Sequence, residues 1–106
     1  MYIRIVKFHL AGISPEAYEQ QAASIAEAFA GWPGLHAKFW LVDDARRTFG
    51  GVYLFASKAD ADQSRSTALF EAMTANPALS DMSIEEFHTL EAPTSVTAAG
   101  LVPAPA

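Results

Sequence analysis

The sequence predicts an α+β domain in which four strands and two helices follow the order β-α-β-β-α-β. Two observations carry this prediction. Residues 34–55 have the alternation of two strands joined by a short charged turn, and Ser14 and Ser57 each stand where a helix would begin. With 106 residues, the chain forms one domain at most.

The strand pair at residues 34–55 is the most informative stretch. A strand points successive side chains to opposite faces, so its first strand has one apolar face and one that carries an imidazole, an ammonium and an indole. The apolar face holds Leu35, Ala37, Phe39 and Leu41, and the other holds His36, Lys38, Trp40 and Val42. A wall that is aromatic but also polar is typical of a small-molecule pocket.

The first helix is predicted to begin at Ser14-Pro15-Glu16. The serine hydroxyl caps a free backbone N–H, proline fits the first turn, and glutamate suits the positive end of the helix dipole. Apolar residues then recur at helical spacing, and residues 31–34 end the helix. The stripe consists of Tyr18, Ala22, Ile25 and Phe29.

The remaining elements follow from similar signals. Residues 2–10 are β-branched and aromatic and predict a strand. Ser57, with Asp60 three positions later, predicts the start of a second helix that ends at Asn76-Pro77. Alternation over 83–90 predicts a fourth strand. At the start of the third strand, Gly50-Gly51 indicates a bulge or a close approach of two backbones.

This order is the ferredoxin-like, or split βαβ, arrangement: a four-stranded antiparallel sheet with two helices on one face. We assign residues 1–91 to this domain and residues 92–106 to an extended Pro- and Ala-rich C-terminal arm or tail. The other face of such a sheet is bare, and 51% of the residues are hydrophobic while only 18% are charged. We therefore expect a homodimer in which a second copy covers this face and encloses a cavity.

Composition also excludes several classes of protein. The net charge of −5, without a basic run, argues against nucleic-acid binding. The lack of cysteine excludes disulfides, thiolate metal sites and a catalytic thiol. The sequence has no signal peptide pattern and no apolar run of about 20 residues, so we expect a cytoplasmic protein without a membrane segment. No phosphate-binding or dinucleotide motif is present, and no cofactor is expected.

The candidate catalytic residues are His36, His88 and Lys38. The histidines lack the spacing of metal ligands, so no metal site is expected. His36 shares its predicted face with Lys38, and His88 shares one with Glu86, where an imidazole beside a carboxylate can act as a general base. The alternative, a strand residue with its ring half exposed, is the more common role for each histidine. Lys38 either stabilises a phenolate or oxyanion or lies in solvent with its stem along an indole ring.

The candidate substrate-binding residues are Trp40, Tyr53, His9 and Phe55. The two larger rings, Trp40 and Tyr53, would stack on a planar ligand, and the alternative is that they pack in a core or a dimer contact. The expected partner besides a second copy is therefore a small aromatic or hydrophobic substrate.

Several motifs together resemble one known family. They are the Gly34-Leu35 start, the Lys38-x-Trp40 pair, the strand Gly50-Gly51-Val52-Tyr53-Leu54-Phe55, and Glu91-x-Pro93-x-Ser95. Over residues 3–97 the chain is similar to the YdhR-type mono-oxygenases, relatives of the antibiotic-biosynthesis mono-oxygenases. The resemblance implies a dimeric α/β barrel and a pocket that includes Lys38, Trp40 and Tyr53. His9 and His88 depart from the family pattern.

The resemblance also implies an activity, the cofactor-independent oxygenation of an aromatic or quinone-like small molecule. Two alternatives stay open from the residues alone. The first is a dimer of the same fold that binds or senses a small molecule without transforming it. The second is a non-oxygenase enzyme of the same superfamily, such as an isomerase or a dehydratase.

Overall fold

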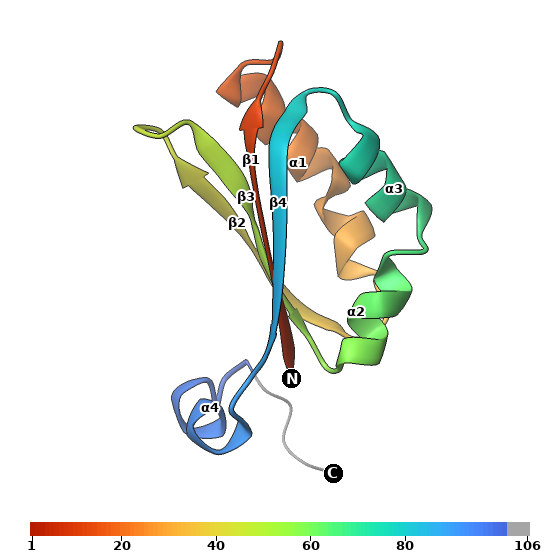
Figure 1. Ribbon diagram of the computed structural model, residues 1–106, viewed down its shortest axis with the longest axis vertical. Helices are drawn as coiled ribbons and strands as arrows, with labels where there is room; N and C mark the ends of the chain where they lie inside the picture. The colour runs from red at the N-terminus through yellow and green to blue at the C-terminus, as the bar shows by residue number, and fades with distance from the viewer. Residues whose placement is uncertain (102–106) are drawn as a thin grey trace.

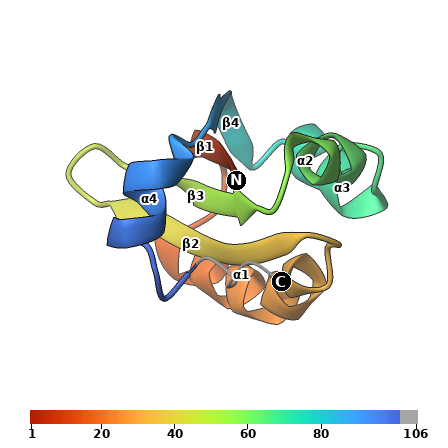
Figure 2. The ribbon, with the colours of Figure 1, turned by 90° about the horizontal axis from the view of Figure 1, so that it is seen from below.

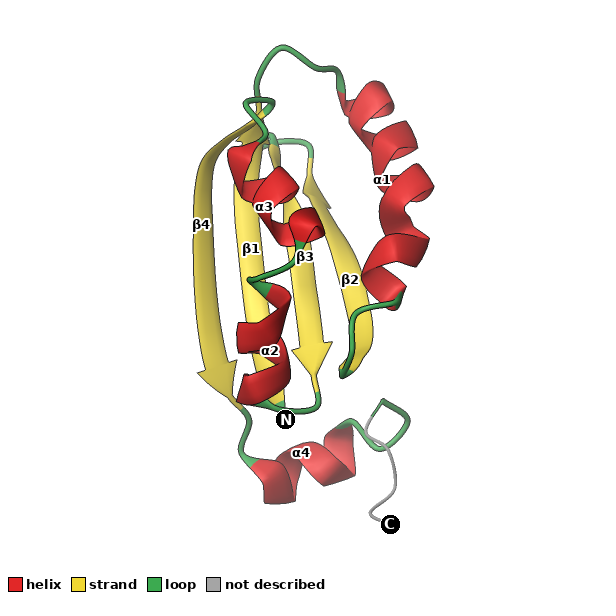
Figure 3. Cartoon of the chain, turned by 90° about the vertical axis from the view of Figure 1, so that its right-hand side faces the viewer, coloured by secondary structure: helices red, strands yellow, loops and turns green. Residues whose placement is uncertain are grey.

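The computed structural model describes residues 1–101 and shows one sheet with a layer of helices on one face (Figure 1). Figure 3 views the sheet through this layer, with α1 lying over the β2 side and α2 and α3 over β1. The strands are β1 (Tyr2–Leu10), β2 (Leu35–Asp43), β3 (Thr48–Phe55) and β4 (Leu79–His88). The helices are α1 (Pro15–Ala30), α2 (Lys58–Ser64), α3 (Ala68–Ala75) and α4 (Glu91–Thr97).

The strand order is β2-β3-β1-β4, and every neighbouring pair is antiparallel. This confirms the predicted α+β, ferredoxin-like sheet. The register places one residue of each strand in a single row across the sheet, in the order Lys38, Tyr53, Arg4, Glu86. Because partners in register point to the same face, all four side chains belong to the face that the helices cover.

The second predicted helix is divided into α2 and α3. The caps predicted at its start are confirmed, since the Ser57 side chain accepts a hydrogen bond from the backbone N–H of Asp60. A second N-cap, Thr67, accepts from the N–H of Phe70 and starts α3 in a new direction. The fourth strand also begins four residues earlier than predicted and ends at His88.

The C-terminal segment differs from the extended arm that the composition predicted. Residues 91–97 form α4, which lies beyond the end of the sheet in Figure 1 and on the side away from α2 and α3 in Figure 2. The N-terminal ammonium group and the hydroxyl of Thr89 both donate to the carboxylate of Glu91, and hydroxyls of Ser95 and Thr97 donate to carbonyls one turn earlier. Pro93 sits in the first turn, where its missing N–H costs no helical bond. The part of the predicted tail at residues 102–106 lies outside the described residues.

A fully buried arginine holds the sheet to the helix layer. Arg4 donates from Nε to the Glu86 carboxylate at 2.6 Å. Its other nitrogens donate to the Ser64 hydroxyl at 2.9 Å and to the Ala61 carbonyl at 2.8 Å. A buried charge is stable only when it is paired and hydrogen-bonded. These bonds therefore fix β1, β4 and α2 relative to one another.

The predicted close approach at the start of β3 is confirmed at Gly50. A Cβ atom at this position would lie 1.8 Å from the backbone oxygen of Val6 on β1, and the φ angle of 157° is one that side chains rarely allow. Only glycine lets β1 and β3 pair here.

We predict that Glu86→Ala lowers the free energy of unfolding by about 3–5 kcal/mol, because it leaves a buried guanidinium without its anion. The measurement is urea unfolding followed by circular dichroism. The control is Glu27→Ala, which removes an exposed carboxylate on α1. Equal losses in the two variants would contradict a structural role for the Arg4–Glu86 pair.

Candidate functional site

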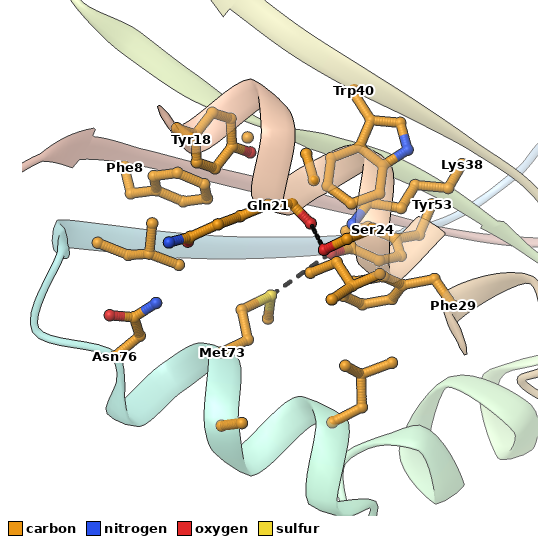
Figure 4. A pocket seen from close by; sticks show the side chains of 16 residues that line it. Phe8, Tyr18, Gln21, Ser24, Phe29, Lys38, Trp40, Tyr53, Met73 and Asn76 are labelled. Carbon is orange, nitrogen blue, oxygen red and sulfur yellow. Dashed lines mark hydrogen bonds between the residues drawn. The ribbon is translucent and has the colours of Figure 1, made fainter. Parts of the chain in front are cut away.

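A cavity of about 290 Å³ lies between the sheet and the helices α1 and α3 (Figure 4). Most of its surface is apolar, with a few polar groups at its walls, as in small-molecule sites. The sheet contributes Phe8, Lys38, Trp40, Gly50, Tyr53 and Leu79. The helices contribute Tyr18, Gln21, Ala22, Ser24, Ile25, Phe29, Leu69, Ala72 and Met73, and Asn76 follows α3.

The ammonium group of Lys38 lies among three aromatic rings of this cavity. Its Nζ atom is 3.4 Å from the ring centroids of both Phe29 and Trp40 and 4.6 Å from that of Tyr53. Cations are attracted to the faces of such rings. Within residues 1–101, no ion pair includes Lys38. The charge is thus held by rings instead of by a carboxylate.

Gly51 makes room for the Lys38 side chain. The register pairs Lys38 with Tyr53 and Trp40 with Gly51, so Gly51 lies on the same face as Lys38, two residues before Tyr53. A Cβ atom at Gly51 would lie 2.9 Å from Cε of Lys38 and 3.3 Å from the Tyr53 ring. The second glycine of the predicted Gly-Gly pair therefore gives the Lys38 side chain room, whereas the first, which lines the cavity, lets β1 and β3 pair closely.

Burial lowers the pKa of Lys38 from 10.5 to about 7. The cause is desolvation, which disfavours the charged form when no opposite charge compensates. Near neutral pH the cavity therefore contains both an ammonium, which can bind an anion, and a free amine, which can take a proton or attack an electrophile.

Two tyrosines add titratable hydroxyl groups to the cavity. The Tyr53 hydroxyl donates to the sulfur of Met73 at 3.5 Å. Burial raises the pKa of Tyr53 well above its usual value and also raises that of Tyr18. Both hydroxyls are therefore protonated at neutral pH and serve as donors, not as bases.

The structure brings three of the residues predicted for the site together. Lys38, Trp40 and Tyr53 share the cavity, as the alternation along β2 and the register with β3 require. Phe55 does not reach it: its ring is fully buried, with the Arg4 guanidinium 5.0 Å from its centroid. Phe55 therefore does not line this cavity, and its role in substrate binding stays a prediction.

None of the three histidines lines the cavity. A register irregularity between Leu35 and Ala37 interrupts the alternation of β2, and His36 is exposed there. His88 ends β4 with its ring 4.8 Å from that of Tyr2. His9 lies in a separate polar hollow, with Nδ1 3.1 Å from the carbonyl oxygen of Arg47.

The helix side of the cavity was missed as a site. The predicted apolar stripe on the first helix is real, and all four of its residues line the cavity, but a stripe that faces a cavity has the same spacing as one packed in a core. Asn76 was interpreted only as a helix end. The polar pair Gln21 and Ser24 beside the stripe was the one available signal.

Within 1–101, no group of three or more His, Cys, Asp or Glu residues is placed to hold a metal ion. None of the helices in this range has the length and apolarity needed to cross a membrane.

Comparison with protein families gives a match over almost the whole chain. Residues 3–100 match the family described as "Putative mono-oxygenase ydhR". The chain belongs to the YdhR mono-oxygenase family. This confirms the resemblance carried by the Lys-x-Trp and Gly-Gly motifs. No curated protein matches the sequence.

Solved structures share the fold at low sequence identity. The protein NE2512 of unknown function from Nitrosomonas europaea is 24% identical, with a TM-score of 0.71 over 86% of this chain and 90% of that one. SnoaB, a cofactor-independent oxygenase from Streptomyces nogalater, is 20% identical, with a TM-score of 0.69 over 85% and 93%. The heme-degrader MhuD from Mycobacterium tuberculosis is 18% identical, with a TM-score of 0.68 over 85% and 96%.

We predict that Lys38→Met raises the free energy of unfolding below pH 7 and that this gain shrinks as the pH rises toward 10.5. Between these pH values the unfolded chain keeps the Lys38 proton and the folded chain does not, so the wild type gains stability with rising pH. Urea unfolding of both proteins across this range measures the difference. A gain that is the same at all pH values would show that the folded-state pKa of Lys38 is not lowered.

Proposed function

We propose that this member of the YdhR family is a cofactor-independent mono-oxygenase that acts on a hydroxylated polycyclic aromatic compound. The observation that carries the proposal is the single lysine, with a pKa of about 7, inside an aromatic cavity. Membership of a mono-oxygenase family and a fold shared with an oxygenase named as cofactor-independent support it.

The chemistry starts with a proton transfer to Lys38. A planar phenol or anthrone lies against Trp40 and Phe29, and the neutral amine takes the acidic proton of the substrate. The electron pair of the broken bond stays on the substrate as a phenolate or enolate, and the new ammonium stabilises this anion. The lysine thus acts first as the base and then as the counter-ion.

The anion then supplies every electron that the oxygenation needs. It transfers one electron to dioxygen, and the two radicals combine to form a carbon–oxygen bond. Loss of water from the resulting hydroperoxide converts a CH₂ group into a carbonyl, so that one oxygen atom enters the product and the other leaves as water. No external reductant takes part. The walls of the cavity keep bulk water away from the anion.

This mechanism reassigns the base that the sequence predicted. His36 and His88 do not line the cavity within one protomer, whereas Lys38 does. The amine also has the pKa that a general base needs near neutral pH.

The proposal includes a homodimer that uses the uncovered face of the sheet. This face carries Phe39 and Phe87, each 50% exposed. Side chains of this size gathered on one surface are typical of an interface. A second copy packed here would enclose the space between the two sheets.

Sedimentation velocity tests the dimer. We expect the wild type to sediment as a dimer at micromolar concentration and Phe39→Asp as a monomer, because the carboxylate would be buried unpaired between the sheets. Ala23→Asp adds the same charge on an exposed position of α1 and should leave the dimer intact. A wild-type monomer would contradict the interface.

Oxygen uptake tests the reaction. We expect the wild type to consume oxygen with an anthrone or a hydroxynaphthacene, and Lys38→Met to lose about 100-fold or more of kcat, the usual contribution of a general base. Lys58→Met is the matched control, since that lysine is exposed and paired with Asp62. Uptake that stays at the buffer level across a panel of such compounds would refute the function, and equal kcat values would refute the role of Lys38.

A further inference from the structure

We propose that Lys38 is also a covalent capture site for aromatic aldehydes and ketones, which it binds as a reversible imine within the cavity. This activity goes beyond the oxygenation proposed above and does not depend on it, because imine formation consumes no dioxygen. The class of ligand follows from the site: a carbonyl group that reaches the amine, attached to a flat apolar body that fills the aromatic cavity.

The position of the amine supports capture. Nζ lies 3.4 Å from the centroids of Phe29 and Trp40, at one wall of the cavity. Among the described residues, no buried side-chain nitrogen or oxygen lacks a hydrogen-bond partner, and no hydrogen bond of Lys38 is present among them. The Nζ atom is therefore still open to the cavity, where a bound carbonyl carbon can approach it. Figure 4 shows Lys38 beside the Trp40 and Tyr53 rings at this wall.

The charges around Lys38 also favour the reactive form. It is the only charged residue among those that line the cavity, and the other titratable groups there are Tyr18 on α1 and Tyr53 on β3. The lining residues of α3 are uncharged. With no carboxylate to hold the proton, a large fraction of Lys38 is a free amine near neutral pH. A desolvated amine of this kind is an activated nucleophile toward carbonyls.

The reaction balances without any further reagent. The lone pair of Nζ forms a bond to the carbonyl carbon, and the electron pair of the broken C=O π bond moves to oxygen, which takes up the proton that the nitrogen loses. The resulting carbinolamine loses water, and nitrogen and carbon are then joined by a double bond. Water that enters the cavity reverses the sequence, so capture is reversible until a hydride donor reduces the imine.

The chain contains its own comparison groups. Its other lysines are Lys7 and Lys58. Lys7 is exposed and points away from the cavity, into the same polar hollow as His9. Lys58 is exposed and donates to Asp62 at 2.8 Å, which raises its pKa. One labelling reaction therefore compares the amine of Lys38, inside the cavity, with two exposed lysine amines in the same molecule.

The test is reductive labelling of the full chain with naphthaldehyde and cyanoborohydride under argon, followed by peptide mapping. Near pH 7 we expect Lys38 to be labelled about tenfold or more faster than Lys58, and we expect this preference to shrink near pH 10, where exposed lysines also lose their protons. Labelling of Lys38 that is no faster than that of Lys7 and Lys58 would overturn the proposal.

Two controls separate the site from general reactivity. Naphthalene, which fits the cavity but has no carbonyl, should slow the labelling of Lys38 and leave that of Lys58 unchanged. Lys38→Arg should abolish the fast phase, and since the wild-type map needs no variant, a folding defect in Lys38→Arg leaves the test intact. Fast labelling without oxygen uptake would refute only the oxygenase. Oxygen uptake without selective labelling would refute only the capture site.

Discussion

The cavity depends on one transverse row of the sheet, in which Lys38, Tyr53, Arg4 and Glu86 stand side by side on four strands. The row has two cations and a single carboxylate. Arg4 takes that carboxylate at 2.6 Å, and the Tyr53 ring lies between Arg4 and Lys38. The ammonium group of Lys38 therefore has no carboxylate partner in this row and contacts aromatic rings instead. A register shift of one residue in any one of these strands would turn that strand's member of the row to the other face of the sheet.

The two cations of the row have different roles because arginine and lysine titrate differently. A guanidinium keeps its proton in any protein environment, so Arg4 needs permanent partners and finds them in Glu86, Ser64 and Ala61. An amine responds to burial by giving up its proton. The fold thus contains a fixed charge, Arg4, that holds β1 to β4 and α2. It also contains a variable charge, Lys38, which stands two strands away on β2 and faces the cavity.

How far the sequence could predict this site depends on the regularity of each strand. Alternation was enough for Lys38, Trp40 and Tyr53, because β2 and β3 are regular from Ala37 onward. It failed for His36, since the irregularity between Leu35 and Ala37 has no distinct residue pattern. The pocket role of Phe55 could not be judged, because a strand pattern gives the face of a residue and not which helix covers it. The division of the second helix at residues 65–67 decides that α3 borders the cavity and α2 covers Arg4.

A ligand that enters this cavity changes the amine that it meets. A neutral aromatic body displaces water from Nζ and adds to the desolvation that already lowers the pKa of Lys38, so the amine becomes more available for attack. An anionic ligand has the opposite effect, because its charge stabilises the ammonium. In the proposed oxygenation the substrate arrives neutral and becomes an anion only after its proton has moved to Lys38. Burial therefore favours the neutral amine of Lys38 before the proton transfer. After the transfer, the anionic substrate favours the ammonium form of Lys38. The proton transfer is thus the step that the cavity stabilises.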